Sequence, residues 1–196
     1  MRSFRPVLAV ALLLLPTAVL AHSPIKGLDN FYAGFLHPIF VPAHLLAALA
    51  LGILCGQQGP KDLQAALIAY LVATLAGLAV SVLPTRPDVE LPLVIGAAAT
   101  GAMVALDRRL PLPVYLLLAT ALGVMVGIDS AQDDLNGRGR LAALLGTLLA
   151  AYMLVLYAMV LSEFFSRRHW QRIGLRIVGS WIAASALLVL SLALAG

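Results

Sequence analysis

Long apolar segments dominate this sequence and limit what it can fold into. Hydrophobic residues make up 62% of the 196 residues and charged residues only 11%, whereas ordinary soluble domains are about 45–50% apolar and about 25% charged. A soluble fold cannot bury so much apolar surface, so the sequence predicts a single domain that spans a membrane. The same composition excludes a disordered chain, a collagen, a coiled coil and a disulfide scaffold.

The first 21 residues have the three parts of a secretory signal peptide. Arg2 and Arg5 form a positive start, residues 7–15 form a short apolar core, and small residues precede a cleavage point after Ala21. The alternative is an uncleaved first helix, but the apolar core is too short to span a membrane comfortably. The sequence therefore predicts a signal peptide at 1–21 and a mature domain at 22–196 that begins outside the cytoplasm.

Apolar runs separated by proline, glycine and charged residues fill the rest of the chain. Backbone groups in hydrocarbon must pair within their own span, so the expected fold is an all-α, polytopic membrane helix bundle. Gly52-xxx-Gly56 and Gly123-xxx-Gly127 are spacings at which helices approach closely, within one chain or between two chains. Read at about 17–25 residues per span, the runs predict six transmembrane helices, at residues 33–55, 63–83, 91–107, 112–129, 141–162 and 175–195.

Lysine and arginine predict the orientation of these spans, because cytoplasmic loops are enriched in both residues. With the mature N-terminus outside, the cytoplasmic side holds the larger set of cations. That set is Lys61, Arg108, Arg109, Arg167, Arg168, Arg172 and Arg176, and the outer set is Lys26, Arg86, Arg138 and Arg140. The bias agrees with the signal peptide and places both mature termini outside. Topology therefore explains the distribution of basic residues. The sequence has no basic face with interleaved aromatic residues, so it predicts no nucleic-acid partner.

Two histidines in the first predicted span are candidate functional residues, because ionisable side chains are rare and unfavourable inside a membrane. His37 and His44 lie on nearly the same helical face, about 10 Å apart along a straight helix. Pro38 and Pro42 remove backbone donors near them and can kink the helix. One interpretation is a polar path, with His37 near the outer mouth and His44 about halfway across. The other is that each histidine hydrogen-bonds a neighbouring helix.

Asp129 closes the fourth predicted span, at a depth comparable with that of His37. Its carboxylate is suited to accept a cation or to hold an imidazole tautomer. The alternative is an ordinary outer helix end, followed by a solvated loop with Asp133 and Asp134. The sequence has no G-x-S-x-G, phosphate-loop or H-E-x-x-H motif, so we expect no enzymatic activity.

The first span resembles a motif of the HupE/UreJ family, G-F-x-H-P-x-x-G-x-D-H-x-L-A. Gly34-Phe35-Leu36-His37-Pro38 and His44-Leu45-Leu46-Ala47 match it at the right separation, and Leu110-Pro111-Leu112-Pro113 is similar to the family's entry to the fourth span. The motif's glycine and aspartate are replaced by Val41 and Ala43. A second family motif, H-G-x-A-H-G-x-E, falls on residues 126–133, where only Gly127 matches and the histidines fall on Val126 and Ser130.

The resemblance implies a permease for a divalent transition metal ion, nickel or cobalt, in a bacterial inner membrane. In the corresponding model of transport we expect His37 to capture the ion, His44 to bind it at the midplane and Asp129 to assist by its charge. The metal would be a transported substrate, with no cofactor bound permanently. The replaced ligands leave a second function open, a non-transporting accessory or assembly protein. Expected partners are the lipid bilayer and either a second copy of the chain or a metalloenzyme-maturation protein.

Overall fold

The computed structural model describes residues 28–59 and 63–195, and the predicted signal peptide at 1–21 lies outside them. The described chain is helical and contains no strand, as the composition predicts. Its helices are α2 (Leu28–Phe40), α3 (Pro42–Gln58), α4 (Leu63–Ser81), α5 (Glu90–Leu106), α6 (Leu112–Asp129), α7 (Gly137–Phe165) and α8 (His169–Ala195).

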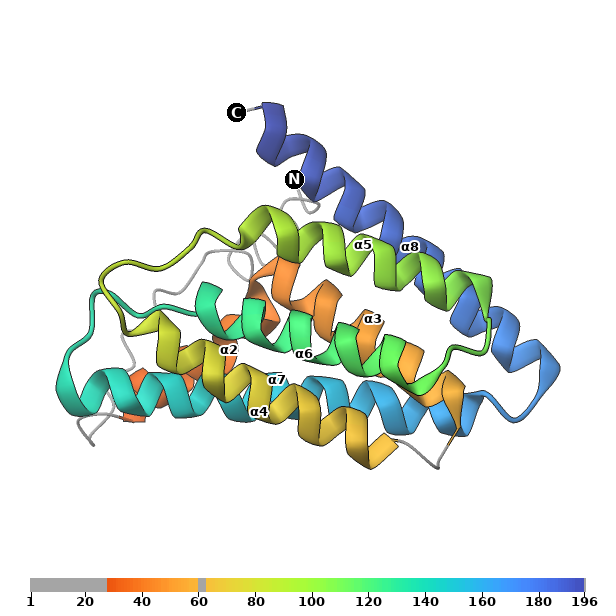
Figure 1. The fold of residues 1–196 in the computed structure, drawn as a ribbon, viewed down its shortest axis with the longest axis horizontal. Coiled ribbons are helices and arrows are strands. Elements are labelled where there is room, and N and C mark those ends of the chain that lie inside the picture. The colour runs from red at the N-terminus through yellow and green to blue at the C-terminus, as the bar shows by residue number, and fades with distance from the viewer. Residues whose placement is uncertain (1–27, 60–62, 196) are drawn as a thin grey trace, which may run out of the picture.

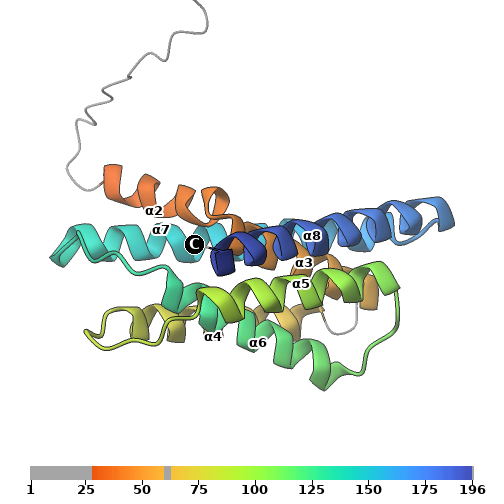
Figure 2. The same ribbon diagram turned by 90° about the horizontal axis from the view of Figure 1, so that it is seen from above.

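These helices form one elongated bundle around α3 (Figures 1 and 2). α3 contacts every other described helix, while the closest pairs around it are α4 with α6, α5 with α8, and α2 with α7. The α4–α5 and α6–α7 loops lie at one end, and the α5–α6 and α7–α8 loops lie at the other (Figure 1). The charge pattern predicts that the first end lies outside, and we call it the expected outer end.

Four of the helices, α4, α6, α7 and α8, are long and apolar enough to cross a membrane. The pair of α2 and α3 makes a fifth if it is one bent span. α5 is apolar but has 17 residues, which is the lower limit of about 17–25 residues for a span. The structure is therefore a helical bundle with four or five candidate membrane spans, and the count of six spans stays a prediction.

The first span, predicted at 33–55 with prolines that can kink it, consists of two helices that meet at 70°. Pro42 has no N–H and cannot donate to the carbonyl of Pro38, so the helix breaks there. Val41 has the extended backbone expected of a residue before proline, with φ −83° and ψ 112°. Pro42 then takes the first position of α3, where the missing N–H does no harm.

Pro38 lies inside α2 and leaves the carbonyl of Gly34 without a helical donor. The hydroxyl of Thr147 on α7 donates to that carbonyl at 3.0 Å, and both groups are buried. α2 approaches α7 so closely here that a Cβ atom at Gly34 would overlap the backbone of Ala143. The proline in α2 is therefore accommodated by a specific contact with α7.

We expect Thr147→Val to lower the free energy of unfolding by about 1–3 kcal/mol, because valine leaves the buried Gly34 carbonyl without a donor. Thermal unfolding of the purified protein in detergent measures the change. Thr120→Val is the matched control, since Thr120 is exposed and its hydroxyl bonds only to the Leu116 carbonyl in its own helix. Equal losses in the two variants would contradict this account of Thr147.

Both Gly-xxx-Gly spacings pack within this chain. Gly52 and Gly56 of α3 lie against α7. Gly123 and Gly127 of α6 lie against α4, where the backbones of the two helices are in direct contact. The sequence left open whether these glycines pack within one chain or between two chains. The structure shows packing within one chain.

Candidate metal centre

The break at Val41 brings the two histidines of the first span close together. His37 lies in the last turn of α2 and His44 in the first turn of α3. Their ring centroids are 5.1 Å apart, with an angle of 73° between the ring planes, whereas a straight helix would separate the residues by about 10 Å. On a straight helix the two imidazoles would be too far apart to share an ion, and the bend removes this obstacle.

Asp129, the last residue of α6, contacts the second of these histidines. The His44 Nε2 atom lies 2.8 Å from the Asp129 Oδ2 atom. His44 is fully buried, while the side chain of Asp129 is 25% exposed. A neutral imidazole bonded in this way carries its proton on Nε2, donates it to the carboxylate and keeps a lone pair on Nδ1.

Two imidazole nitrogens at this site have no hydrogen-bond partner among the described residues. They are Nε2 of His37 and Nδ1 of His44, and both atoms are buried. A buried polar atom without a partner costs about 1–3 kcal/mol. Imidazole nitrogen is also a good ligand for nickel, cobalt and zinc. The two nitrogens are therefore available as donors to a divalent transition metal ion, while the carboxylate of Asp129 bonds to the other nitrogen of His44 and adds negative charge nearby.

This set of protein donors is small. Across residues 28–59 and 63–195 no group of three or more His, Cys, Asp and Glu side chains is placed to hold a metal ion. His44 and Asp129 form a close pair, and His37 joins it only through its ring contact with His44. An ion held here would need further ligands from water, from backbone atoms or from a molecule that arrives with it.

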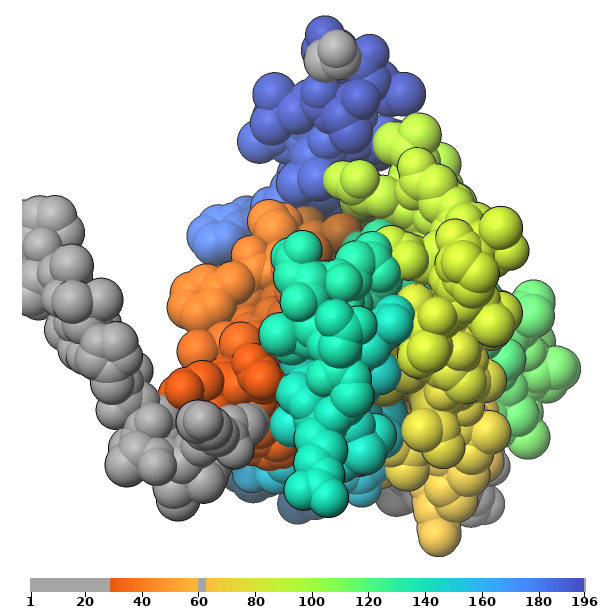
Figure 3. Space-filling view, turned by 90° about the vertical axis from the view of Figure 1, so that its left-hand side faces the viewer, coloured from red at the N-terminus to blue at the C-terminus, as the bar shows by residue number. Residues whose placement is uncertain are grey.

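A cavity of about 990 Å³ opens beside Asp129 at the expected outer end. Figure 3 looks onto this end, where the segment joining α6 to α7 lies between α2 and the α4–α5 region. The residues that line the cavity come from the α4–α5 loop, the end of α6, the α6–α7 loop and the start of α7. The charged ones are Arg86, Asp88, Asp129, Asp133 and Arg140. Asp129 therefore lines the open cavity and also contacts the buried His44.

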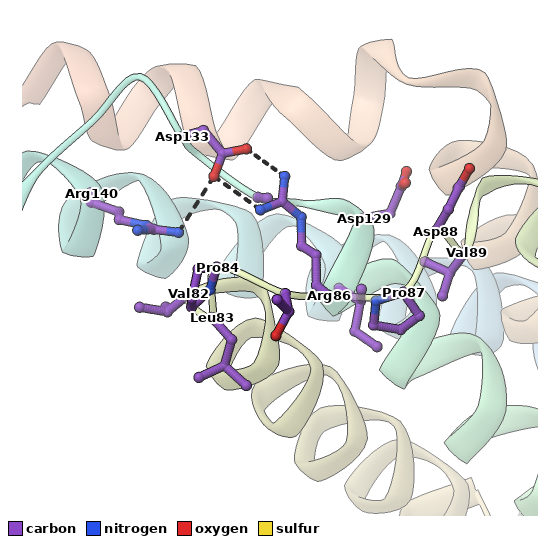
Figure 4. Close-up of a pocket in the computed structure, with 13 residues that line it drawn as sticks. Val82, Leu83, Pro84, Arg86, Pro87, Asp88, Val89, Asp129, Asp133 and Arg140 are labelled. Carbon is purple, nitrogen blue, oxygen red and sulfur yellow. Dashed lines mark hydrogen bonds and ion pairs between the residues drawn. The ribbon is translucent and has the colours of Figure 1, made fainter.

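Two arginines in this cavity surround one carboxylate (Figure 4). Arg86 donates to both oxygens of Asp133, with Nη1 3.1 Å from Oδ1, and Nη2 of Arg140 lies 3.8 Å from the same Oδ1. The hydrogen bond from Arg86 lowers the pKa of Asp133 below its ordinary value near 3.8. Because the folded-state pKa is lowered, this pair stabilises the fold fully at pH values above the ordinary pKa of Asp133. The stabilisation is lost as the pH falls through the lowered pKa.

The HupE/UreJ protein family model matches residues 10–189 of the chain. The chain belongs to the HupE/UreJ family. The match covers α2 through most of α8, so it confirms the resemblance noted in the first span. Neither the curated proteins nor the solved structures contain a match to the chain.

The positions that carry the second family motif supply little to this HupE/UreJ site. Val126 is apolar and buried. The hydroxyl of the buried Ser130 donates to the Val126 carbonyl at 2.6 Å, one turn earlier in α6. Asp133, at the position of the motif's glutamate, is engaged by Arg86 instead of facing His44. Asp129, which is not a ligand position of that motif, provides the carboxylate that touches His44.

The sequence interpretation of this HupE/UreJ chain missed the arginine–carboxylate cluster. It treated Asp133 as a solvated loop residue, and it used Arg86 and Arg140 only to assign topology. Arg86 and Asp133 are separated by 47 positions, so no local pattern connects them. The only signal available was that several charged residues share two loops predicted on the same side of the membrane.

Proposed function

We propose that this HupE/UreJ protein carries a divalent transition metal ion, nickel or cobalt, across the membrane from the outer side. The contact between His44 and Asp129, beside the ring of His37, is the observation that supports it most strongly. Imidazole and carboxylate groups suit these ions. Ionisable side chains that are buried in a membrane bundle commonly mark the path of an ion or a substrate.

The depth of the three residues suggests an order of contact. Asp129 lines the outer cavity and touches His44, so its negative charge is the first that an ion leaving the cavity would meet. His44 is fully buried and lies next to His37. In this proposal His44 is the inner ligand, Asp129 attracts the ion by its charge, and His37 binds it from the α2 side.

The bundle is closed on the inner side of His44. Ala47, Leu51 and Leu54 follow it along α3, and each is at most 1% exposed. Passage beyond His44 therefore requires helices to move relative to α3. Closure on one side of a site that is open on the other is what transport by alternating access requires.

A second function, a membrane accessory protein that does not transport, is favoured by one observation. The described residues place no third His, Cys, Asp or Glu donor in a metal-binding group. A protein that kept the HupE/UreJ scaffold and lost transport would show such a reduced donor set.

Uptake of radioactive nickel or cobalt by cells that produce the chain tests the proposal. We expect uptake above that of cells without it. The double variant His37→Ala with His44→Ala should reduce this uptake by at least about tenfold, since both imidazole ligands are lost. His169→Ala is the matched control, because His169 is exposed at the opposite end of the bundle and should leave uptake unchanged.

Two results would contradict the transport proposal. Uptake that persists in the double variant would remove His37 and His44 from the path of the ion. Wild-type protein that binds no metal when purified, yet copurifies with a stable partner, would favour the accessory function.

A further inference from the structure

The outer cavity is larger than a bare metal ion needs. Its volume of about 990 Å³ lies at the upper end of the range of about 300–1,000 Å³ that is typical of pockets for small molecules. It also lies directly against Asp129, which contacts the buried His44. The size and position of the cavity therefore suit a small molecule whose metal-bearing part reaches Asp129.

One part of the cavity, formed by Arg86, Arg140 and Asp133, is unsuited to a bare cation. Guanidinium groups repel divalent cations and bind carboxylates through a planar set of N–H donors. Arg86 and Arg140 both face Asp133, so one carboxylate is shared between two cations. The Nε atom of Arg140 is buried and has no hydrogen-bond partner within the described chain. Two guanidinium groups around one carboxylate therefore leave one net positive charge in this part of the cavity for a further carboxylate.

Positive and negative groups occupy different parts of this cavity. Figure 4 shows Arg86 and Arg140 converging on Asp133 on one side, with the carboxylates of Asp129 and Asp88 on the other. A metal ion chelated by a small carboxylate has the complementary arrangement, a cation at its centre and anionic groups at its edge. Such a complex can present its metal to Asp129 while its carboxylates meet the arginines.

We infer that the substrate is a divalent metal ion chelated by a small carboxylate, and that Arg86 and Arg140 bind the chelator. This inference rests on the proposed transport function, because it specifies the form in which the metal reaches His44 and Asp129. It also accounts for the small donor set of the protein. The chelator supplies most of the ligands, and the imidazole of His44 has only to take one exchangeable position on the metal.

Equilibrium binding to the purified full-length protein in lipid nanodiscs tests the inference. The two probes are radioactive nickel alone and radioactive nickel with enough citrate to complex nearly all of it. We expect the wild-type protein to bind the citrate complex at least about tenfold more tightly than nickel alone, a difference of about 1.4 kcal/mol. Arg86→Gln and Arg140→Gln should each abolish this preference and leave the affinity for nickel alone unchanged or higher.

Control variants separate recognition from folding. Arg138→Gln should keep the wild-type preference, because Arg138 is an exposed arginine of the same outer region and does not line the cavity. Arg140 also donates to the carbonyl of Ser81 at 3.0 Å, so its loss can disturb the α4–α7 contact. Arg86→Gln leaves that bond intact, and Arg140→Lys keeps the charge without the planar donors and should retain part of the preference.

Each outcome decides between the two proposals. If nickel alone binds and citrate only weakens binding by withdrawing the metal, the chelate inference is wrong and the transport proposal stands. The same holds if the citrate complex is preferred but neither arginine variant changes that preference. If neither probe binds the wild-type protein, the proposed metal site fails and the chelate inference fails with it.

Discussion

Asp129→Asn is expected to lower the affinity of the purified protein for nickel or cobalt by at least about tenfold while the fold stays intact. Asparagine has nearly the shape of aspartate, and its carbonyl oxygen can still accept the bond from Nε2 of His44. The substitution removes the negative charge and the carboxylate ligand, both of which favour a divalent ion. Equilibrium binding of the radioactive metal measures the loss, and thermal unfolding checks the fold.

Asp134→Asn is the matched control for this experiment. Asp134 is exposed in the α6–α7 loop that follows Asp129 and does not line the outer cavity, so its neutralisation should leave metal affinity unchanged. An Asp129→Asn protein that binds metal as well as the wild type would show that Asp129 only orients the His44 ring. A similar loss in both variants would mean that the loop attracts cations only through its overall charge.

Gly127→Val is expected to prevent stable folding, or to lower the free energy of unfolding by more than about 3 kcal/mol, beyond the usual range for overpacked cores. A Cβ atom at this position would lie 2.6 Å from the backbone nitrogen of Leu78 and 2.8 Å from the carbonyl carbon of Gly77. Both contacts are with backbone atoms of α4, which cannot rotate away as a flexible side chain can. α4 and α6 would have to separate, and α6 carries Asp129.

The yield of monodisperse protein in detergent and the midpoint of thermal unfolding measure this effect. Gly174→Ala is the control, because a Cβ atom at that position of α8 meets nothing within 4 Å. Alanine also favours a helix over glycine by about 1 kcal/mol, so the control should be as stable as the wild type or slightly more stable. Wild-type stability in Gly127→Val would mean that α4 and α6 are not in backbone contact.

Helix positions were predictable from the sequence wherever a change of polarity ends an apolar run. α6 occupies residues 112–129, as predicted, because Pro111 precedes it and Asp129 closes it. α7 extends past the predicted 141–162 at both ends and spans Gly137–Phe165. Hydropathy identifies only the part of a helix that lies in hydrocarbon, so residues such as Arg138 and Glu163 lie in the helix but outside the predicted span.

The arrangement of the candidate site could be predicted only in part. The sequence identified His37, His44 and Asp129 from the unfavourable placement of ionisable groups in a membrane. It did not predict that His44 and Asp129 are in contact, since 85 positions separate them and only the packing of α3 and α6 joins them. It predicted that Pro38 and Pro42 can kink the helix, but not that a break at Val41 brings the two ring centroids to 5.1 Å.

The break at Val41 also determines which part of the first span can move. α3 is held in place by all the other described helices, whereas α2 rests mainly on α7. Two backbone angles of a single residue, now −83° and 112°, therefore set how far apart the two imidazoles stand. Rotation about those bonds would widen or narrow the gap between the rings only if α2 also moved along α7, where Thr147 bonds to the Gly34 carbonyl.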